Sequence, residues 1–482
     1  MRLNYIANAL GLILSDIGLF AFIPIITALY YQEWGSLLPF FAAGIFALFV
    51  GDVLKRIGNS GNDVLNDIKK SEALIIVSLS WLLFGVIAAV PYLFFGLSPI
   101  NALFEGVSGI TTTGATILQD FDLPKSLIFW RSFTQWLGGM GIIVLFVAIL
   151  PQFAVAGRQM FFAEAPGPTE DKITPRIKNT ASALWIVYFG LTVLCAFCLW
   201  LAGMPVYDSI CNSMSTVSAG GFSPHSNSIG GYGSNVICWI VIVFMFLSGT
   251  SYILQSRVLT RRKLSLLFKS EEFRCYAILI VVFSLILAGV LFAQQHYSVF
   301  HSLTAGFFQI LSISTSTGAS SENYQLWSFS AKIILFIAMF ISSCSGSAGG
   351  GLKITRWILI FKYIKNELYK ILHPNAVISI KIDNRVVAPD VIRQTLFFAF
   401  CFFGLWAGTA IALTILEQNI VIGLTSAIAS IGDIGPALGR VIGPMGDYSS
   451  LKDISKLIFI FNMLVGRLEI IPFLVLFHKD FW

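Results

Sequence analysis

Residues 101–116 read NALFEGVSGITTTGAT, and three later segments repeat this pattern in one register without gaps. The later copies are DSICNSMSTVSAGGFS (208–223), AGFFQILSISTSTGAS (305–320) and IGLTSAIASIGDIGPA (422–437). Each copy combines a stretch of helical length, a serine or alanine at one fixed place, and a glycine third from its end. The fixed residues are Ser108, Ser215, Ser312 and Ala429, and the glycines are Gly114, Gly221, Gly318 and Gly435. Such recurrence indicates a fold built from copies of one unit.

The composition is that of a polytopic membrane protein. Of the 482 residues, 56% are hydrophobic and 12% are charged, whereas soluble domains carry about 25% charged residues. This excludes soluble, disordered, collagen-like and disulfide-scaffold proteins. The period-2 alternation of a membrane β-barrel is absent. Ten stretches with few or no charges predict spanning helices, namely 3–30, 34–51, 73–97, 132–157, 180–206, 234–256, 275–295, 333–352, 394–416 and 457–477.

Each repeated segment lies between two predicted spans and is too short to cross a membrane itself, so it reads as a re-entrant segment. The sequence therefore predicts an all-α membrane protein with two N-terminal helices and four parallel units of helix, pore loop and helix. Parallel copies favour a pseudo-fourfold arrangement around one pore. The predicted boundaries are 1–70 for the N-terminal helices and linker, then 71–178, 179–272, 273–390 and 391–482 for the four units.

Basic residues predict the orientation. Lys and Arg concentrate in segments 55–70, 158–178, 257–274 and 353–393, and are few in the repeated segments. By the positive-inside rule the basic segments are cytoplasmic, and the repeated segments enter from the other side. With about ten spans, both termini are expected in the cytoplasm.

The chemistry of the repeats is that of a cation filter. A permeating cation must exchange its water for other oxygen ligands, which converging loops of extended backbone supply as carbonyls. Glycine permits the backbone conformations and the close approach that this requires, and each re-entrant helix directs its partially negative C-terminal end toward the membrane centre. The candidate cation ligands are the four pore loops: Thr111, Thr112, Thr113 and Gly114; Ser218, Ala219, Gly220 and Gly221; Thr315, Ser316, Thr317 and Gly318; and Gly432, Asp433, Ile434 and Gly435.

These segments resemble the TrkH/TrkG/KtrB family of potassium uptake proteins. The motifs that carry the resemblance are Gly109-Ile-Thr-Thr-Thr-Gly114, Ser218-Ala-Gly-Gly221-Phe-Ser, Thr315-Ser-Thr-Gly318 and Gly432-Asp-Ile-Gly435-Pro. Arg131-x4-Trp136-x-Gly-Gly-Met-Gly141, Gly346-Ser-Ala-Gly-Gly-Gly351 and Gly466-Arg467-Leu-Glu469 extend it. The two additional N-terminal helices favour the TrkH branch.

The resemblance implies potassium uptake across the bacterial inner membrane through a gated, channel-like pore. It also implies a homodimer in membrane lipid and a cytoplasmic ring of TrkA-type nucleotide-binding subunits that regulates the pore. Potassium would be the transported ion. Because this chain has no Walker-type loop, we expect any nucleotide to bind the partner, and we expect neither enzymatic activity nor binding to nucleic acid.

Two positions depart from the pattern of the family. The fourth pore loop has Gly432-Asp433 where asparagines are usual, and Ala219 replaces a usual threonine. The acid at position 433 could attract cations, or could bond neighbouring amides as part of the structure.

The candidate gate consists of the glycine loop, residues 346–351, and Arg467. The loop residues are Gly346, Ser347, Ala348, Gly349, Gly350 and Gly351. Each helical glycine costs about 1 kcal/mol relative to alanine, so this run should interrupt its span and form a mobile barrier below the filter; close helix packing is the alternative. Arg467, in the last span, should face the cavity or a partner because a membrane charge is costly. It could contact the loop, or pair with Glu469 or Asp16.

Polar residues recur nine positions before each pore-loop glycine. They are Glu105, Asn212, Gln309 and Ser426. Support of the loops from behind is the favoured interpretation, and direct contact with the ion is the alternative.

Two other functions compete with this interpretation. An ion-coupled secondary transporter usually has inverted repeats, which the parallel copies disfavour, but proton- or sodium-coupled potassium symport stays open. A lipid-modifying enzyme could hold magnesium at Asp63-x-x-x-Asp67, although no base or nucleophile lies nearby in the sequence.

Overall fold

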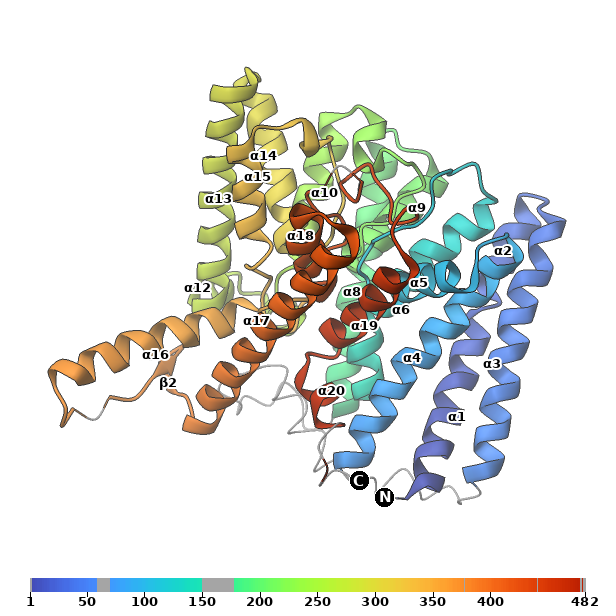
Figure 1. The fold of residues 1–482 in the computed structure, drawn as a ribbon, viewed down its shortest axis with the longest axis horizontal. Coiled ribbons are helices and arrows are strands. Elements are labelled where there is room, and N and C mark those ends of the chain that lie inside the picture. The colour runs from blue at the N-terminus through green and yellow to red at the C-terminus, as the bar shows by residue number, and fades with distance from the viewer. Residues whose placement is uncertain are drawn as a thin grey trace.

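The computed structural model describes residues 2–58, 70–149, 177–376, 378–439, 441–476 and 479. The described residues are mostly helical and contain only one short two-stranded hairpin, which confirms the predicted all-α class. In Figure 1 the long helices run roughly side by side from one end of the molecule to the other, and short helices enter between them from one end. The start of α1 and the final helix α20 lie at the opposite end.

The N-terminal helices form a hairpin beside the repeats. It consists of α1 (Leu3–Phe20), α2 (Ile23–Tyr30), a short 3-10 helix η1 (Trp34–Ser36) and α3 (Leu37–Gly58). Glu33, at the tip of this hairpin, accepts hydrogen bonds from the backbone N–H groups of Lys125 and Ser126, at 2.6 and 3.0 Å. These donors open helix α6 (Lys125–Ile149), so the acid caps that helix and ties the hairpin to the first repeat.

The first two repeats follow the predicted order of long helix, short helix, loop and long helix. The first comprises α4 (Lys70–Phe94), α5 (Pro99–Ile110) and α6. The second comprises α8 (Ile177–Leu201), α9 (Val206–Val217), η4 (Ser228–Tyr232), α10 (Asn235–Ser248) and α11 (Tyr252–Arg261), with α12 (Ser265–Lys269) leading onward.

The third and fourth repeats have the same order. The third comprises α13 (Glu271–Gln295), α14 (Val299–Ser314), η5 (Tyr324–Leu326), α15 (Phe329–Ala338) and α16 (Ile354–Leu372). A short hairpin follows, formed by two strands of two residues each, β1 (Lys381–Ile382) and β2 (Arg385–Val386). Its turn residues Asp383 and Asn384 both have positive φ, as a tight hairpin requires. The fourth comprises α17 (Pro389–Glu417), α18 (Ile420–Ile431), α19 (Asp453–Arg467) and α20 (Ile471–Val475).

The short helices α5, α9, α14 and α18 are the pore helices. Local sequence starts three of them: Ser98 and Ser298 accept hydrogen bonds from backbone N–H groups three residues on, and Asn419 accepts two. Such side-chain caps satisfy donors that a helix leaves open at its first turn. Pro99 is the first residue of α5, where its fixed φ suits the first turn, and Pro205 directly precedes α9. The four pore helices confirm the re-entrant segments.

The helix after the pore loop is interrupted in three repeats. The predicted span over 234–256 bends by 95° between α10 and α11. The predicted span over 333–352 is helical only to Ala338, and the chain runs without a helix to Lys353. The last predicted span ends as a helix at Arg467, where Glu469 and Ile470 take positive φ. Arg467 therefore ends a helix and does not lie within one continuous span.

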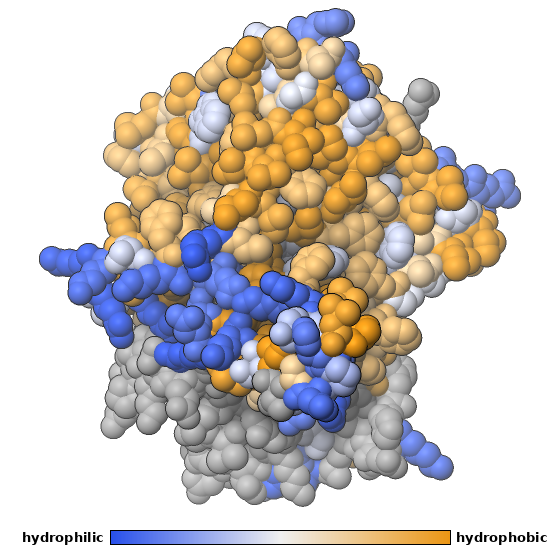
Figure 2. Space-filling view, turned by 90° about the vertical axis from the view of Figure 1, so that its left-hand side faces the viewer, coloured by the Kyte–Doolittle hydropathy of each residue, from blue (hydrophilic) through white to orange (hydrophobic). Residues whose placement is uncertain are grey.

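Apolar side chains cover the outside of the bundle. Six described helices are long and apolar enough to cross a membrane, or seven if α10 and α11 count as one span. On α13 the exposed side chains include Ile278, Val281, Val282, Leu285 and Ile286. Figure 2 shows this apolar surface above a band of hydrophilic side chains at the level of α16 and the β1–β2 hairpin. An apolar exterior of this kind is typical of a protein whose solvent is lipid.

Candidate functional site: four converging pore loops

The four pore loops meet in a closed ring. Each loop glycine lies so close to the next loop that a methyl group on it would overlap a backbone carbonyl oxygen there. The pairs, in chain order, are Gly114 with Gly220, Gly221 with Thr317, Gly318 with Ile434, and Gly435 with Thr113. This order returns to its starting point, so the loops surround one axis with pseudo-fourfold symmetry. Glycine is required here because any side chain would collide with a neighbouring loop.

Each pore helix ends in the same backbone conformation. The residue two before the glycine is left-handed in every loop, with φ of 57° at Thr112, 57° at Ala219, 56° at Ser316 and 52° at Asp433. The N–H of the next residue donates to the carbonyl five residues back in all four loops, at 2.8–3.0 Å. This is the Schellman ending of a helix, which usually has glycine at the left-handed position. The pore glycines themselves have φ between 71° and 90°.

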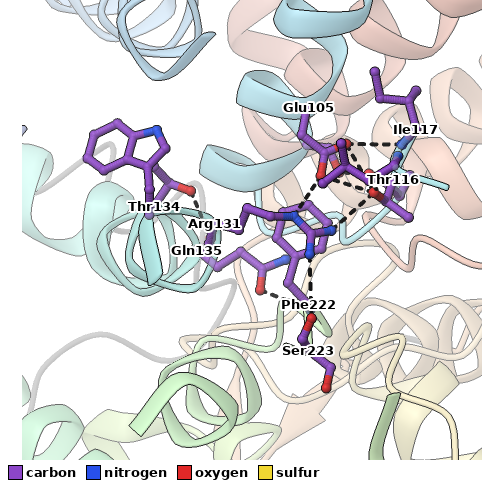
Figure 3. Close-up of polar contacts among 12 residues, drawn as sticks. Glu105, Thr116, Ile117, Arg131, Thr134, Gln135, Phe222 and Ser223 are labelled. Carbon is purple, nitrogen blue, oxygen red and sulfur yellow. Dashed lines mark hydrogen bonds and ion pairs between the residues drawn. The ribbon is translucent and has the colours of Figure 1, made fainter. Parts of the chain in front are cut away.

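Glu105 and Arg131 brace the first two loops from behind. The carboxylate of Glu105, fully buried, accepts hydrogen bonds from Thr116 Oγ1 and from the N–H of Ile117, at 3.0 Å each, and from Arg131 Nε at 2.9 Å. Arg131 also donates to the carbonyl of Ser223 beyond loop 2 and lies over the Phe222 ring, 4.0 Å from its centroid. Figure 3 shows its guanidinium between the carboxylate and Ser223. One buried ion pair thus links two repeats.

The other three residues at this position act differently. Asn212 donates to the Tyr232 hydroxyl at 2.9 Å, and Gln309 to Ser321 Oγ at 3.4 Å. Ser426 bonds only within its own helix, to the Ile422 carbonyl. Support from behind therefore fits Glu105 best.

Gln135, between the motif residues Arg131 and Trp136, fastens loop 2. Its Nε2 donates to the Gly220 carbonyl at 2.6 Å, and its Oε1 accepts from Ser215 Oγ at 2.9 Å and the Phe222 N–H at 3.1 Å. It makes these contacts from helix α6 of another repeat. Its spacing from Arg131, four residues on a helix, places both on one face, and this is the one sequence signal that could have identified it.

The glycine loop lies against pore loops 3 and 4. The N–H of Gly350 donates to Ser316 Oγ at 2.7 Å. A methyl group on Gly349 would be 2.5 Å from the Thr315 carbonyl oxygen, and one on Gly350 would be 2.7 Å from that of Gly432. Both glycines therefore permit a contact that larger residues could not make.

Two cationic side chains hold the glycine loop. Arg467 donates to the carbonyls of Ala348, at 2.9 Å, and Gly138, at 2.7 Å. Lys353 donates to the Gly349 carbonyl. The predicted contact between Arg467 and the loop is present in the structure, whereas Glu469 pairs with Arg356. Asp16 lies exposed on α1.

Two cavities adjoin the pore loops and the glycine loop, and they are named here the outer cavity and the inner cavity. The outer one is lined by Gly114, Gly221, Gly318, Pro436, His225 and Tyr448, among others. The inner one is lined by the whole glycine loop with Lys353, Arg467 and Glu469. The pore-loop glycines thus line the outer cavity, and the glycine loop lines the inner cavity.

The remaining candidate residues form no second site among the described residues. Within this part of the chain, no cluster of three His, Cys, Asp or Glu side chains could hold a metal. Asp63 and Asp67 lie outside the described residues.

Parallel repeats whose re-entrant loops converge define a class of membrane protein built around one central pore. The family model TrkH, described as a cation transport protein, matches residues 38–481. The chain belongs to the TrkH family, which is a family of potassium transporters and not of enzymes.

Named relatives match over the full chain. The Trk system potassium uptake protein TrkH of Salmonella typhimurium is 36% identical and covers 100% of both chains. The Trk system potassium uptake protein TrkG of Escherichia coli K12 is 33% identical and covers 95% of this chain and 94% of its own. The crystal structure of the potassium transporter TrkH from Vibrio parahaemolyticus is 31% identical, covers 100% of both chains and superposes with a TM-score of 0.89.

Proposed function

We propose that this chain forms a potassium-selective uptake pore in the bacterial inner membrane, with the four pore loops as its filter. The closed ring of loops carries this proposal, because it is the arrangement in which backbone carbonyls can replace the water of an ion. Four pore helices directing their C-terminal ends to the ring favour a cation there. The transported ion is assigned as potassium because the relatives are named potassium uptake proteins.

The glycine loop and Arg467 form the gate of the proposed pore. The loop lies on the inner side of the ring, and Arg467 fixes it through the Ala348 carbonyl while placing a positive charge below the filter. Opening requires the loop to leave pore loops 3 and 4. The charge would also repel a potassium ion waiting below.

The wider assembly is proposed from the family. A homodimer in the membrane, a cytoplasmic ring of TrkA-type subunits that binds the regulatory nucleotide, and cytoplasmic termini are the expected arrangement. The unit boundaries at 70, 178, 272 and 390 belong to the same proposal. The hydrophilic band around α16 supports the orientation, because Lys362, Lys365 and Lys370 of that helix lie at the end opposite to the starts of the pore helices.

Flux through purified protein in liposomes tests the filter. We expect potassium and rubidium flux down their gradients, little sodium flux and no accompanying proton movement. Gly114→Ser should weaken discrimination against sodium, because its side chain would collide with the Gly220 carbonyl. Gly289→Ala is the matched control, since a methyl group there meets open space.

Two outcomes would contradict the proposal. Stoichiometric proton or sodium movement with potassium would indicate a coupled symporter. Intact selectivity in Gly114→Ser would show that loop 1 does not form the filter in the assigned register.

A further inference from the structure

The four left-handed residues of the pore loops occupy equivalent places, and one of them is acidic. They are Thr112, Ala219, Ser316 and Asp433. Gly350 of the glycine loop contacts two of them: its N–H donates to Ser316 Oγ, and a methyl group on it would be 2.8 Å from Asp433 Oδ2. Ser316 and Asp433 therefore face the glycine loop.

The carboxylate of Asp433 is only half satisfied. Oδ1 accepts a hydrogen bond from Thr113 Oγ1 at 3.0 Å, which joins loop 4 to loop 1. Oδ2 is buried and has no hydrogen-bond partner, in a residue that is 0% exposed. A buried polar atom without a hydrogen-bond partner is costly in free energy. A ligand that is absent while the glycine loop is in place would therefore stabilise this oxygen.

Other oxygen atoms surround the same place. The Gly432 carbonyl lies beside Gly350 together with Oδ2, and Ser316 Oγ would be released if the glycine loop moved away. Thr112 Oγ1, the hydroxyl at the equivalent place of loop 1, is also buried without a partner. Carboxylate, carbonyl and hydroxyl oxygens are the ligands of hard cations such as potassium.

Two cationic side chains link the glycine loop to Asp433. Arg467 and Lys353 both act on Asp433 electrostatically, and both donate to carbonyls of the glycine loop. If the loop moves, Arg467 loses its contact with the Ala348 carbonyl and Lys353 loses its contact with the Gly349 carbonyl. A mobile cation can then approach the carboxylate.

We propose that the Asp433 carboxylate is a cation-binding site at the inner mouth of the filter, covered by Gly350 when the glycine loop is in place and occupied by a permeating ion when it is not. The site rests on the proposed function and adds an acidic residue to it. This residue belongs to one pore loop only, so it breaks the fourfold symmetry that a ring of neutral carbonyls would have. Its charge makes the inner mouth selective for cations and sensitive to divalent blockers.

Block by Ba²⁺, added alone to one side of a planar bilayer, tests this site. The measurements use the full chain with Arg467→Ala, which should keep the pore open. We expect Asp433→Asn to weaken block from the cytoplasmic side about tenfold or more, because a divalent ion loses its attraction to the carboxylate, while Asn still accepts from Thr113. Block from the outer side should stay within about twofold.

Two further variants distinguish charge from structure. Asp453→Asn removes an acid whose side chain is 64% exposed at the start of α19, and should leave inner block unchanged. Ala219→Asp places a carboxylate at the equivalent position of loop 2, where a left-handed backbone suits Asp. This variant should strengthen Ba²⁺ block from the cytoplasmic side. Combined with Asp433→Asn, it should restore the block that Asp433→Asn weakens.

The outcomes separate the two proposals. Unchanged inner block in Asp433→Asn with normal potassium current would overturn the site, and so would unchanged block in Ala219→Asp if the first variant does not fold. Absence of potassium current in the unaltered chain and in Arg467→Ala alike would count against the proposed pore instead.

Discussion

At the scale of residues, the buried pair of Glu105 and Arg131 supports pore loops from two repeats at once. Removing one partner of a buried ion pair leaves the other charge uncompensated, which costs about 3–5 kcal/mol. We therefore expect Arg131→Met to lower the free energy of unfolding by about that amount, measured by denaturant unfolding in detergent. The double variant Arg131→Met with Glu105→Leu should recover part of the loss, because no charge then stays buried. A double variant less stable than Arg131→Met would show that the ion pair is not the source of the effect.

Some residues of the candidate site could be predicted from the sequence, and others could not. Gly114, Gly221, Gly318 and Gly435 were identified from the repeat, since only glycine permits both their φ and their contacts. The left-handed conformation of Thr112, Ala219, Ser316 and Asp433 could not be predicted, because threonine, alanine and serine have no intrinsic preference for it. Gln135 was missed because its partners belong to another repeat, and one repeat read alone contains no sign of them.

At the scale of elements, hydrogen bonds from Arg467 and Lys353 hold the glycine loop in place, so losing one should affect how often the pore opens. Arg467→Ala removes charged donors to Ala348 and Gly138. Hydrogen bonds from charged groups contribute about 1.5–3 kcal/mol each, and each 1.4 kcal/mol is a tenfold change in equilibrium. We expect basal potassium flux in liposomes without the cytoplasmic partner to rise at least about tenfold. Normal expression with unchanged or reduced flux would contradict a barrier held by Arg467.

The glycines of this element should act in the same direction. Gly349→Ala and Gly350→Ala place a methyl group within 2.5–2.7 Å of carbonyl oxygens in pore loops 3 and 4, so the loop can no longer lie against them. Higher basal flux is expected, measured in the same liposome assay. Gly404→Ala, on α17, is the matched control because a methyl group there meets open space. An equal rise in that variant would trace the effect to a general change in the protein.

Elements also show where sequence patterns stop being informative. The uncharged runs identified every long helix before a pore loop, because such helices need only length and apolar character. The helices after the loops break at Gly249, at residues 339–353 and after Arg467. Uncharged runs continue through the first two of these breaks, so hydropathy alone predicts an unbroken span. At the first break the chain lies close to a pore loop, since a methyl group on Gly249 would be 2.7 Å from the Thr315 side chain.

At the scale of the whole molecule, the fourfold arrangement was predictable because four copies with the same orientation leave few other arrangements around one pore. The order of contact around the ring was not, since it depends on backbone oxygens of neighbouring copies. The orientation in the membrane, predicted from basic segments, makes the ring's outer cavity face away from the cytoplasm and puts the glycine loop on the cytoplasmic side.

Accessibility of single cysteines in intact cells checks this orientation. Asp453→Cys marks the start of α19 on the outer side, and Leu372→Cys marks the end of α16, where the native side chain is 75% exposed. Four native cysteines are buried, so replacing the partly exposed Cys198, Cys275 and Cys401 by serine gives a suitable background. A membrane-impermeant maleimide should label the Asp453→Cys variant in whole cells, and the Leu372→Cys variant only after the cells are opened. The reverse pattern would mean that the pore helices enter from the cytoplasm, and Arg467 with the glycine loop would then face the outside, where a cytoplasmic partner could not control them.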